Sequence, residues 1–338
     1  MQLCRRLVVG LGLLAPFALF FAGRGVKRAQ LEVWKVGDKA VLHLSDDGSL
    51  LVADQAIGHH TYKIEVWDVR AYRVRGSVYV KDASAVDVAA LSSDGARLVL
   101  RRRDFSAALP GLCEIWDTHL APFRCLGSWK FRYDETVVDA ARVGANWKFL
   151  LPDAVETRDD AGELISRIAL QVAPKFAHCT RGALSRDGKV AVFAPYARVF
   201  DAGTGNFKRE LWNTEWEMSQ VSLSPSGRFC WSQTSYLFSE GQGSTSGLWN
   251  TQSGTEIRSN RFSSAPIFSP DETAALDDKG RFINISDGKP SRFQIAWPRV
   301  KSLDFACAQL SRDGAVWAVP DAQGKVWIRE GAAKTASP

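Results

Sequence analysis

The chain has 338 residues, of which 46% are hydrophobic and 24% are charged, and its formal net charge is +6. Twelve Trp, 18 Phe and 27 Gly against only two Met favour strands joined by turns, and the ordinary charged fraction argues against long disordered stretches. Five basic residues and no acidic residue lie in residues 1–28, so the rest of the chain carries a net charge of only +1. A nearly neutral body argues against nucleic-acid binding, and we expect no nucleic-acid partner.

Residues 1–28 read as a membrane signal. Residues 7–23 are uncharged and have basic residues on both sides. As a helix they would extend about 25 Å, near the lower limit for crossing a hydrocarbon core of about 30 Å. The bulky Phe20 and Phe21 stand where a signal peptidase needs small residues. We therefore favour an uncleaved anchor formed by residues 7–23, with the rest of the chain extracytoplasmic, and keep export after cleavage as the alternative.

A short phrase, Ser-x-Asp-Gly or a close variant followed by an apolar run, recurs along the chain. Its serines are Ser45, Ser92, Ser185, Ser224, Ser269 and Ser311. The successive gaps are 47, 93, 39, 45 and 42 residues, and the gap of 93 holds a degenerate unit, residues 137–170, in which Gly-Ala-Asn replaces the turn. The period is close to the roughly 40 to 45 residues of a propeller blade, so the chain contains seven units.

Each unit predicts four short antiparallel strands. The first strand ends at the serine, Asp-Gly supplies the positive φ of a tight hairpin, and a second apolar run returns. The third strand ends in an aromatic residue followed by Asp or Asn, as in Trp67-Asp68, Trp116-Asp117, Phe200-Asp201 and Trp249-Asn250. A fourth strand completes the sheet. Because four strands alone cannot bury two apolar faces, we expect the units to stack in a ring.

These residues resemble the WD40-type β-propeller family, in a divergent form in which Ser-x-Asp-Gly is clearer than the Gly-His element. The resemblance covers about residues 31–330 and rests on six turn motifs and two true Trp-Asp pairs. It departs from the family at Gly58-His59, the one Gly-His dipeptide, which falls between the second and third strands of its unit. The resemblance implies an all-β, seven-bladed β-propeller of four-stranded antiparallel blades, and the uncharged residues 7–23 predict an N-terminal hydrophobic helix before it.

The two ends of the repeat region complement each other. The last unit has three strands, and the strand-like residues 31–36 precede the first unit. The resemblance implies that residues 31–36 form the outer strand of the last blade and close the ring. The expected organisation is a signal or anchor segment at residues 1–28, a propeller at residues 29–331 and a disordered tail at residues 332–338.

Linear catalytic and cofactor motifs are absent from the sequence, and we expect no enzymatic activity, cofactor or metal site. The acidic stretch that begins at Asp159 reads as a turn between strands. A propeller enzyme would bind its ligand at the central channel, where Asp87 and Asp139 are the best candidates, although solvated residues at a channel mouth are the simpler interpretation. A hydrolase or oxidoreductase with a channel-mouth site remains the alternative function.

The cysteines form no recognisable framework. The six residues include no Cys-x-x-Cys pair, so neither a disulfide scaffold nor a zinc site is predicted. Cys113 and Cys125 are the pair that one hairpin would bring together in an oxidising compartment. Whether they pair is left open.

Three long connections between second and third strands predict a binding face. They are residues 54–62, 101–111 and 233–247. Insertions on one face of a repeat protein often mark its binding face, and exposed aromatic and arginine side chains suit a protein or peptide interface. The candidate partner-binding residues are Arg101, Arg102, Arg103, Phe105, Trp212, Trp216, Tyr236, Phe238 and His59. We expect a non-catalytic interaction platform, monomeric itself, whose protein partner docks on this end and not on the Ser-x-Asp-Gly end.

Overall fold

The computed structural model divides into two units, residues 1–31 and residues 32–338, and each is taken by itself. The structure describes residues 31–35, 41–58, 60–71, 73–81, 83, 85–103, 111–119, 121–131, 137–172, 181–194, 197–211, 218–238, 241–259, 262–277, 279–295, 297, 303–321 and 325–330. The predicted N-terminal helix and the predicted tail lie outside the described residues.

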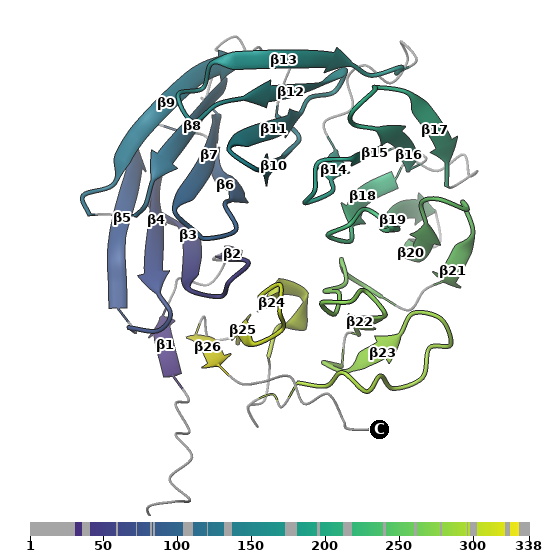
Figure 1. Ribbon diagram of the computed structural model, residues 1–338. Helices are drawn as coiled ribbons and strands as arrows, with labels where there is room; N and C mark the ends of the chain where they lie inside the picture. Colours follow the sequence, from purple (N-terminus) through teal and green to yellow (C-terminus); the bar gives the residue numbers. More distant parts are fainter. Residues whose placement is uncertain are drawn as a thin grey trace, which may run out of the picture. The chain divides into compact units, whose positions relative to one another are not determined.

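Five four-stranded antiparallel sheets, here called blades 1 to 5, follow one another in chain order around a ring (Figure 1). Blade 1 contains β2 (Val41–Leu44), β3 (Leu50–Gly58), β4 (Thr61–Asp68) and β5 (Arg73–Lys81). Blade 2 contains β6 (Ala85–Leu91), β7 (Arg97–Arg103), β8 (Gly111–Asp117) and β9 (Arg124–Phe131). Blade 3 contains β10 (Asp139–Val143), β11 (Asn146–Leu150), β12 (Ala154–Arg158) and β13 (Leu164–Ala169).

Blade 4 contains β14 (Gly182–Leu184), β15 (Val190–Phe193), β16 (Arg198–Asp201) and β17 (Phe207–Glu210). Blade 5 contains β18 (Met218–Leu223), β19 (Phe229–Phe238), β20 (Gly241–Asn250) and β21 (Glu256–Ser259). In each blade the first strand lies at the centre of the ring and the fourth at its edge (Figure 1). The arrangement is an all-β propeller with four-stranded antiparallel blades, as expected.

The closing blade joins the two ends of the propeller. Its strands are β24 (Gln309–Leu310), β25 (Val316–Pro320), β26 (Lys325–Glu330) and β1 (Leu31–Lys35), preceded by the short 3-10 helix η3 (Phe305–Cys307). The sheet order β1-β26-β25-β24 places β1 in the outermost position. The N-terminal strand therefore completes the last sheet, which is the position the sequence predicted for it.

The sixth unit corrects the expectation of seven four-stranded blades, because the described residues form six. This unit contains a two-stranded sheet, β22 (Ala274–Leu276) and β23 (Phe282–Asn284). Only isolated bridges, Phe268 with Ala275 and Ile283 with Pro290, mark where its first and fourth strands would run. Proline lacks the N–H that a ladder needs, and Pro290 stands in the fourth-strand position, with Pro266 and Pro270 on either side of the first.

The serine turns follow from hydrogen bonds within each motif. Ser45 Oγ donates to Asp47 Oδ1 at 2.7 Å and accepts from the Leu50 N–H at 3.0 Å, so the turn and the start of the next strand are tied together. Gly48 has a φ of +67°, and a Cβ on it would lie 2.5 Å from Val316 Cγ2 of the closing blade. Only glycine satisfies both the turn and the close approach of the neighbouring blade.

The hydrophobic core consists of layers between adjacent blades. One layer joins blades 1 and 2 through residues such as Val66 and Leu98, and another joins blades 2 and 3 around Trp147 and Phe149, all fully buried. Both faces of each sheet are thus covered, which explains the apolar runs in the second strands. The blades hold one another in place and fix the direction in which their turns and hairpins project.

The cysteine register separates the one pair that sequence reasoning considered. Cys113 of β8 lies opposite Trp129, and Cys125 of β9 lies opposite Trp116. Neither is in a disulfide; Cys113 is buried and Cys125 is exposed. The hairpin does not bring them together because they occupy different rungs of the ladder.

Candidate functional site

The β19–β20 hairpin is the longest hairpin among the described residues. It pairs ten positions without interruption, from Phe229 with Asn250 to Phe238 with Gly241. Residues 233–247 were expected to be a loop, and this expectation was wrong. The segment is rich in Thr, Ser and aromatic residues and contains no proline, so nothing in it prevents pairing.

The outer half of this hairpin projects beyond its own blade. On one side the pairing with β18 ends at Met218 with Thr234, and on the other side the pairing with β21 ends at Gly247 with Ser259. We call residues 235–246 the projecting tip. Within the described residues, its two strands pair with each other and with no third strand.

The β3–β4 hairpin of blade 1 provides a contrast. Residues 54–62 were also expected to be a loop, but most of them are strand, and the ladder runs from Leu50 with Asp68 to Gly58 with Thr61. The fourth strand β5 covers β4 to its end, since Thr61 pairs with Lys81. In blade 5, by contrast, the described part of the fourth strand pairs only up to Gly247 with Ser259, and the β19–β20 ladder continues beyond it.

The predicted partner-binding residues fall into three groups. Arg101, Arg102 and Arg103 lie at the end of β7, and Tyr236 and Phe238 lie in the backbone of the projecting tip. Phe105, Trp212, Trp216 and His59 lie outside the described residues.

Arg101 has a structural role. Its guanidinium donates hydrogen bonds to the carbonyl oxygens of Val137 and Val138, the latter at 3.3 Å. Val137 and Val138 lead into β10, so Arg101 links blade 2 to blade 3.

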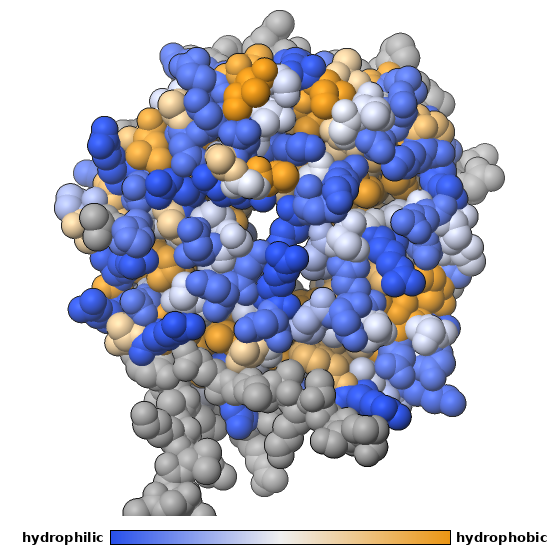
Figure 2. Space-filling model, viewed as in Figure 1, coloured by the Kyte–Doolittle hydropathy of each residue, from blue (hydrophilic) through white to orange (hydrophobic). Residues whose placement is uncertain are grey.

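The channel end formed by the serine turns holds a cavity of about 1200 Å³. Basic and acidic side chains line it in equal numbers: Arg142, Arg186, Lys189, Arg228 and Arg312 against Asp46, Asp139, Asp187, Asp271 and Glu272. Figure 2 shows mainly hydrophilic residues around the central opening, with hydrophobic residues in separate patches farther out. The mixed charge does not indicate a ligand of either sign.

Asp46 links its own turn to the turn of the neighbouring closing blade and to a turn of blade 4, which is not a neighbour in the ring. Its carboxylate lies 2.6 Å from the guanidinium of Arg186 of blade 4, and its carbonyl oxygen accepts from the Arg312 N–H of the closing blade at 2.7 Å. Burial raises the pKa of Asp46, although Arg186 and Arg312 act against it. These contacts stabilise the mouth of the channel.

Asp139 lines the same cavity but is engaged on both carboxylate oxygens. One oxygen accepts from the Ala140 N–H at 2.8 Å, and the other accepts from the Leu184 N–H of blade 4 at 2.7 Å. Burial raises the pKa of Asp139 to about 6 against the effect of these hydrogen bonds and of Arg101. Asp139 thus joins blades 3 and 4. Asp87 lies in β6, where its Cα is opposite that of Arg101.

The sequence did not reveal the contacts between blades. It predicted the stretch that begins at Asp159 as a turn, but not that this turn contacts another blade. This stretch is the turn between β12 and β13, as expected. Asp160 in it accepts from Arg97 of blade 2 at 3.1 Å and from Trp147 Nε1 at 2.9 Å. Trp147 belongs to the same unit as Asp160, but Arg97 lies 63 residues away in another unit and could not be recognised as a partner from one unit alone.

Among the described residues, no group of three or more His, Cys, Asp or Glu side chains gathers in a way that could hold a metal ion. No helix in the part of the chain that the structure describes is long and apolar enough to span a membrane. The predicted anchor, residues 7–23, lies outside that part.

Comparisons with known proteins support the fold. No protein-family model matches the chain, and no curated protein matches it. A solved structure to which it is similar is the "Crystal Structure of Mitotic Checkpoint Complex", with a TM-score of 0.60 and 14% identity over 90% of this chain and 94% of that chain. In all, 858 chains of solved structures match, so the likeness is to a widely used fold and not to one activity. The ring of four-stranded blades and this likeness together support a WD40-like β-propeller fold.

Proposed function

We propose that this protein is a non-catalytic interaction platform, a WD40-like propeller of the divergent Ser-x-Asp-Gly type, and that its protein partner docks on the projecting tip. The observation that carries the proposal is that residues 235–246 extend past both β18 and β21. A two-stranded ribbon is only marginally stable in water by itself. A partner that covers it would stabilise the ribbon and gain a preformed binding edge.

The sequence of the tip suits this kind of docking. Tyr236 and Phe238 provide large side chains of the type that dominates interface energetics. The β20 half, Gly-Gln-Gly-Ser-Thr-Ser, is flat and polar, and such an edge can pair with an added strand through main-chain hydrogen bonds. Arg102 and Arg103, at the end of β7, would add charge on the same end of the ring. The likeness to a chain from a checkpoint complex supports a protein partner as the kind of ligand.

Shortening the hairpin tests the proposal. Residues 235–244 are replaced by Asn-Gly, which closes a two-residue hairpin between Thr234 and Thr245, whose hydroxyls already lie 2.8 Å apart. Cross-linking with mass spectrometry on the full chain in its native extract then identifies partners whose cross-links map to the tip. We expect these partners to be lost from the shortened variant, while its thermal unfolding remains cooperative.

The matched control changes the opposite end of the ring. Ala145→Asp lies in the exposed turn between β10 and β11, where it should not affect a partner on the tip. The proposal fails if the shortened variant folds and retains the same cross-linked partners as the wild type.

We also propose that residues 7–23 anchor the protein in a membrane, with the propeller on the extracytoplasmic side. The uncharged stretch and its basic flanks support this. Full-length protein should resist carbonate extraction and be digested by external protease, whereas residues 29–338 should be soluble. A soluble product with a trimmed N-terminus would establish export after cleavage instead, and a soluble product with an intact N-terminus would overturn both.

A further inference from the structure

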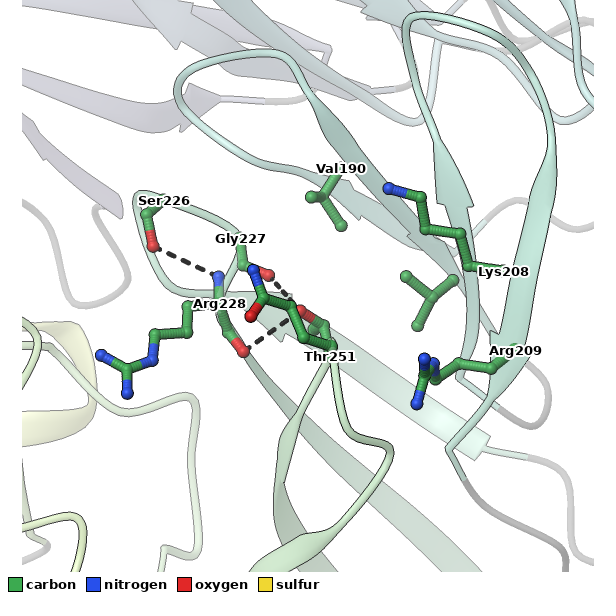
Figure 3. Close-up of a pocket in the computed structure, with 9 residues that line it drawn as sticks. Val190, Lys208, Arg209, Ser226, Gly227, Arg228 and Thr251 are labelled. Carbon is green, nitrogen blue, oxygen red and sulfur yellow. Dashed lines mark hydrogen bonds between the residues drawn. The ribbon is translucent and has the colours of Figure 1, made fainter.

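A second cavity, of about 440 Å³, lies between blades 4 and 5 (Figure 3). Val190 and Val199 provide apolar surface, and three of the remaining lining residues are basic: Lys208, Arg209 and Arg228. None of the described residues that line it is acidic. Figure 3 shows Lys208 and Arg209 on one side of the space and Ser226, Arg228 and Thr251 on the other.

The basic side chains of this cavity are unequally neutralised. Lys208 Nζ lies 2.9 Å from Asp201 Oδ2, so its charge is paired. Arg228 packs over the ring of Phe229, with its Cζ 5.0 Å from the ring centroid. Arg209 Nε is buried and has no hydrogen-bond partner among the described residues, which is also true of Arg258 Nε at the next junction, so the two sites differ in the charge beside the arginine and not in this donor. The cavity therefore combines positive charge with an unused buried donor.

The next junction of the ring, between blade 5 and the sixth unit, provides a comparison for Arg209. Arg209 is opposite Val199, and Arg258 is opposite Leu248, in both cases one residue before the bulge of its blade. Each arginine lies against the glycine of the following unit's turn. A Cβ on Gly254 would be 3.1 Å from Arg209 Nη1, and a Cβ on Gly288 would be 3.2 Å from Arg258 Nε. The two arginines are structural equivalents.

The turns that these arginines face also match. The Gly254 N–H donates to the Asn250 carbonyl at 2.8 Å, and the Gly288 N–H donates to the Asn284 carbonyl at 2.9 Å. Before each glycine stands a side chain that accepts from a backbone N–H two residues later. This side chain is Ser253 in one turn, at 3.2 Å, and Asp287 in the other, at 2.9 Å. Ser253 thus occupies the place of Asp287.

Because Ser253 occupies the place of Asp287, the charge beside Arg209 differs from the charge beside Arg258. The pKa of Asp287 is lowered, first by the hydrogen bond from the Lys289 N–H and also by Arg258, so that the carboxylate and this arginine interact. At the junction of blades 4 and 5 the corresponding position is a neutral hydroxyl. Arg209 therefore lacks the negative neighbour that its equivalent has.

We propose that the cavity between blades 4 and 5 binds an acidic peptide, with a carboxylate or phosphate of the peptide beside Arg209 in the place that Asp287 fills for Arg258. Charge-assisted hydrogen bonds from a guanidinium to such groups are among the stronger polar contacts in proteins. The cavity volume of about 440 Å³ is many times that of a small ion, because one water molecule, which is of similar size, occupies about 30 Å³ in the liquid. Val190 and Val199 then contact the aliphatic part of the peptide.

This site is distinct from the projecting tip and goes beyond the proposed function. The cavity lies at the Phe229 end of β19 and the tip begins at residue 235, so about six residues of strand, roughly 20 Å, separate them. Loss of one site should leave the other intact, so each proposal can fail by itself.

Peptide binding to the full chain tests the inference by fluorescence anisotropy. The probe is a labelled Gly-Glu-Gly-Glu-Gly peptide, with the same peptide carrying phosphoserine or Gln in place of Glu for comparison. We expect both anionic peptides to bind at low ionic strength and the Gln peptide to bind at least about tenfold more weakly. The stronger of the two anionic peptides identifies whether a carboxylate or a phosphate is preferred.

The decisive variant is Ser253→Asp, which places a carboxylate beside Arg209 as Asp287 is placed beside Arg258. Ser253 is exposed and its equivalent already carries Asp, so the substitution should leave the melting temperature unchanged. Binding of the anionic peptides should fall about tenfold in Ser253→Asp and in Arg209→Gln, while the control Arg258→Gln should bind within twofold of the wild type.

Two results would overturn the inference. Wild-type protein that binds the anionic peptides no better than the Gln peptide has no acidic-peptide site. Binding that Ser253→Asp leaves unchanged is an adventitious attraction of anions to other basic residues.

Discussion

The carboxylates of the ring are of two kinds, and they differ in how far they reach along the chain. Asp47 and Asp94 each accept the hydroxyl of a serine two residues earlier, at 2.7 Å, and so stabilise their own turns. Glu272 reaches back 48 residues and accepts from Ser224 Oγ at 3.0 Å and from the Ser226 N–H at 2.7 Å. Local carboxylates make each turn independent, whereas Glu272 makes the turn of blade 5 depend on the sixth unit.

The Glu272 contact results from two departures from the repeat. Ser226 stands where the motif has Asp, and Glu272 stands where the next motif has Gly, with a φ of +54°. A non-glycine residue in this region is strained. The turn of blade 5 has Ser226 in place of the motif's Asp, and Glu272, which replaces the Gly of the next motif, supplies the missing carboxylate.

Burial separates the two kinds of carboxylate further. Partial burial raises the pKa of Asp47 and Asp94, but the hydrogen bonds of their turns outweigh it and the net pKa is lowered. For Asp139, which reaches from blade 3 to blade 4, burial dominates and the pKa rises to about 6. Asp139 is therefore sensitive to mildly acidic pH in the opposite direction from Asp47 and Asp94.

Removing the cross-blade carboxylate should have the largest effect. Glu272→Gly relieves the positive φ but leaves Ser224 and Ser226 without their acceptor. We expect a loss of about 3 kcal/mol in the free energy of unfolding, because each hydrogen bond to a buried charged group contributes about 1.5 to 3 kcal/mol and the bonds are not additive. Urea unfolding measures it.

The matched control restores the carboxylate within the turn of blade 5. The double variant Ser226→Asp with Glu272→Gly has the repeat motif in both units and should recover most of the lost stability. If the double variant is as unstable as Glu272→Gly alone, the cross-blade hydrogen bonds do not account for the loss.

The next effect is a pH dependence that comes from Asp139. Its folded pKa of about 6 lies above the ordinary value of 3.8, so between these values the folded state holds a proton that the unfolded state releases. Stability should therefore fall as pH rises from about 4 to about 6, by on the order of 2 kcal/mol, and level off above. The difference between wild type and Asp139→Asn in urea titrations isolates this group. A difference that stays constant across the window would contradict the prediction.

The smallest effect is expected at a local turn. Asp94→Ala removes the acceptor of the Ser92 hydroxyl and of the Ala96 N–H at 3.0 Å, and should cost about 1 kcal/mol at neutral pH. Because the pKa of Asp94 is lowered in the fold, the advantage of the wild type should persist at pH 5 and shrink only as pH falls below the ordinary value of 3.8. An advantage that instead grows as the pH falls from 6 to 4 would show that Asp94 behaves like Asp139.

The sequence was sufficient to predict the features that recur within one unit. The serine turns, the blade order and the place of residues 31–35 follow from a period and from local turn chemistry. The prolines of the sixth unit are visible in the sequence, but the repeat motif at Ser269 outweighed them in the prediction. The hairpin of residues 229–250 was read as a loop because Ser, Gly and Thr are common in both states, and only pairing across the turn distinguishes them.

The candidate sites were harder to predict than the fold. The contacts of Asp139, Glu272 and Arg209 join residues of different units, and no periodicity within one unit shows which side chains will face each other. The signal that was available is the exception to the repeat. One such exception is Ser253, which stands where the equivalent turn has Asp287. The other is the pair Ser226 and Glu272, which stand where the repeat motif has Asp and Gly.

The closing blade has a consequence for synthesis of the chain. Its outermost strand, β1, is made first, and its neighbour β26 is made last. Until residues 325–330 leave the ribosome, the ring stays open and β1 has no partner strand in its sheet. Exposed strand edges recruit other chains, so a ribosome-bound chain of this protein should need a chaperone for nearly the whole time of its translation.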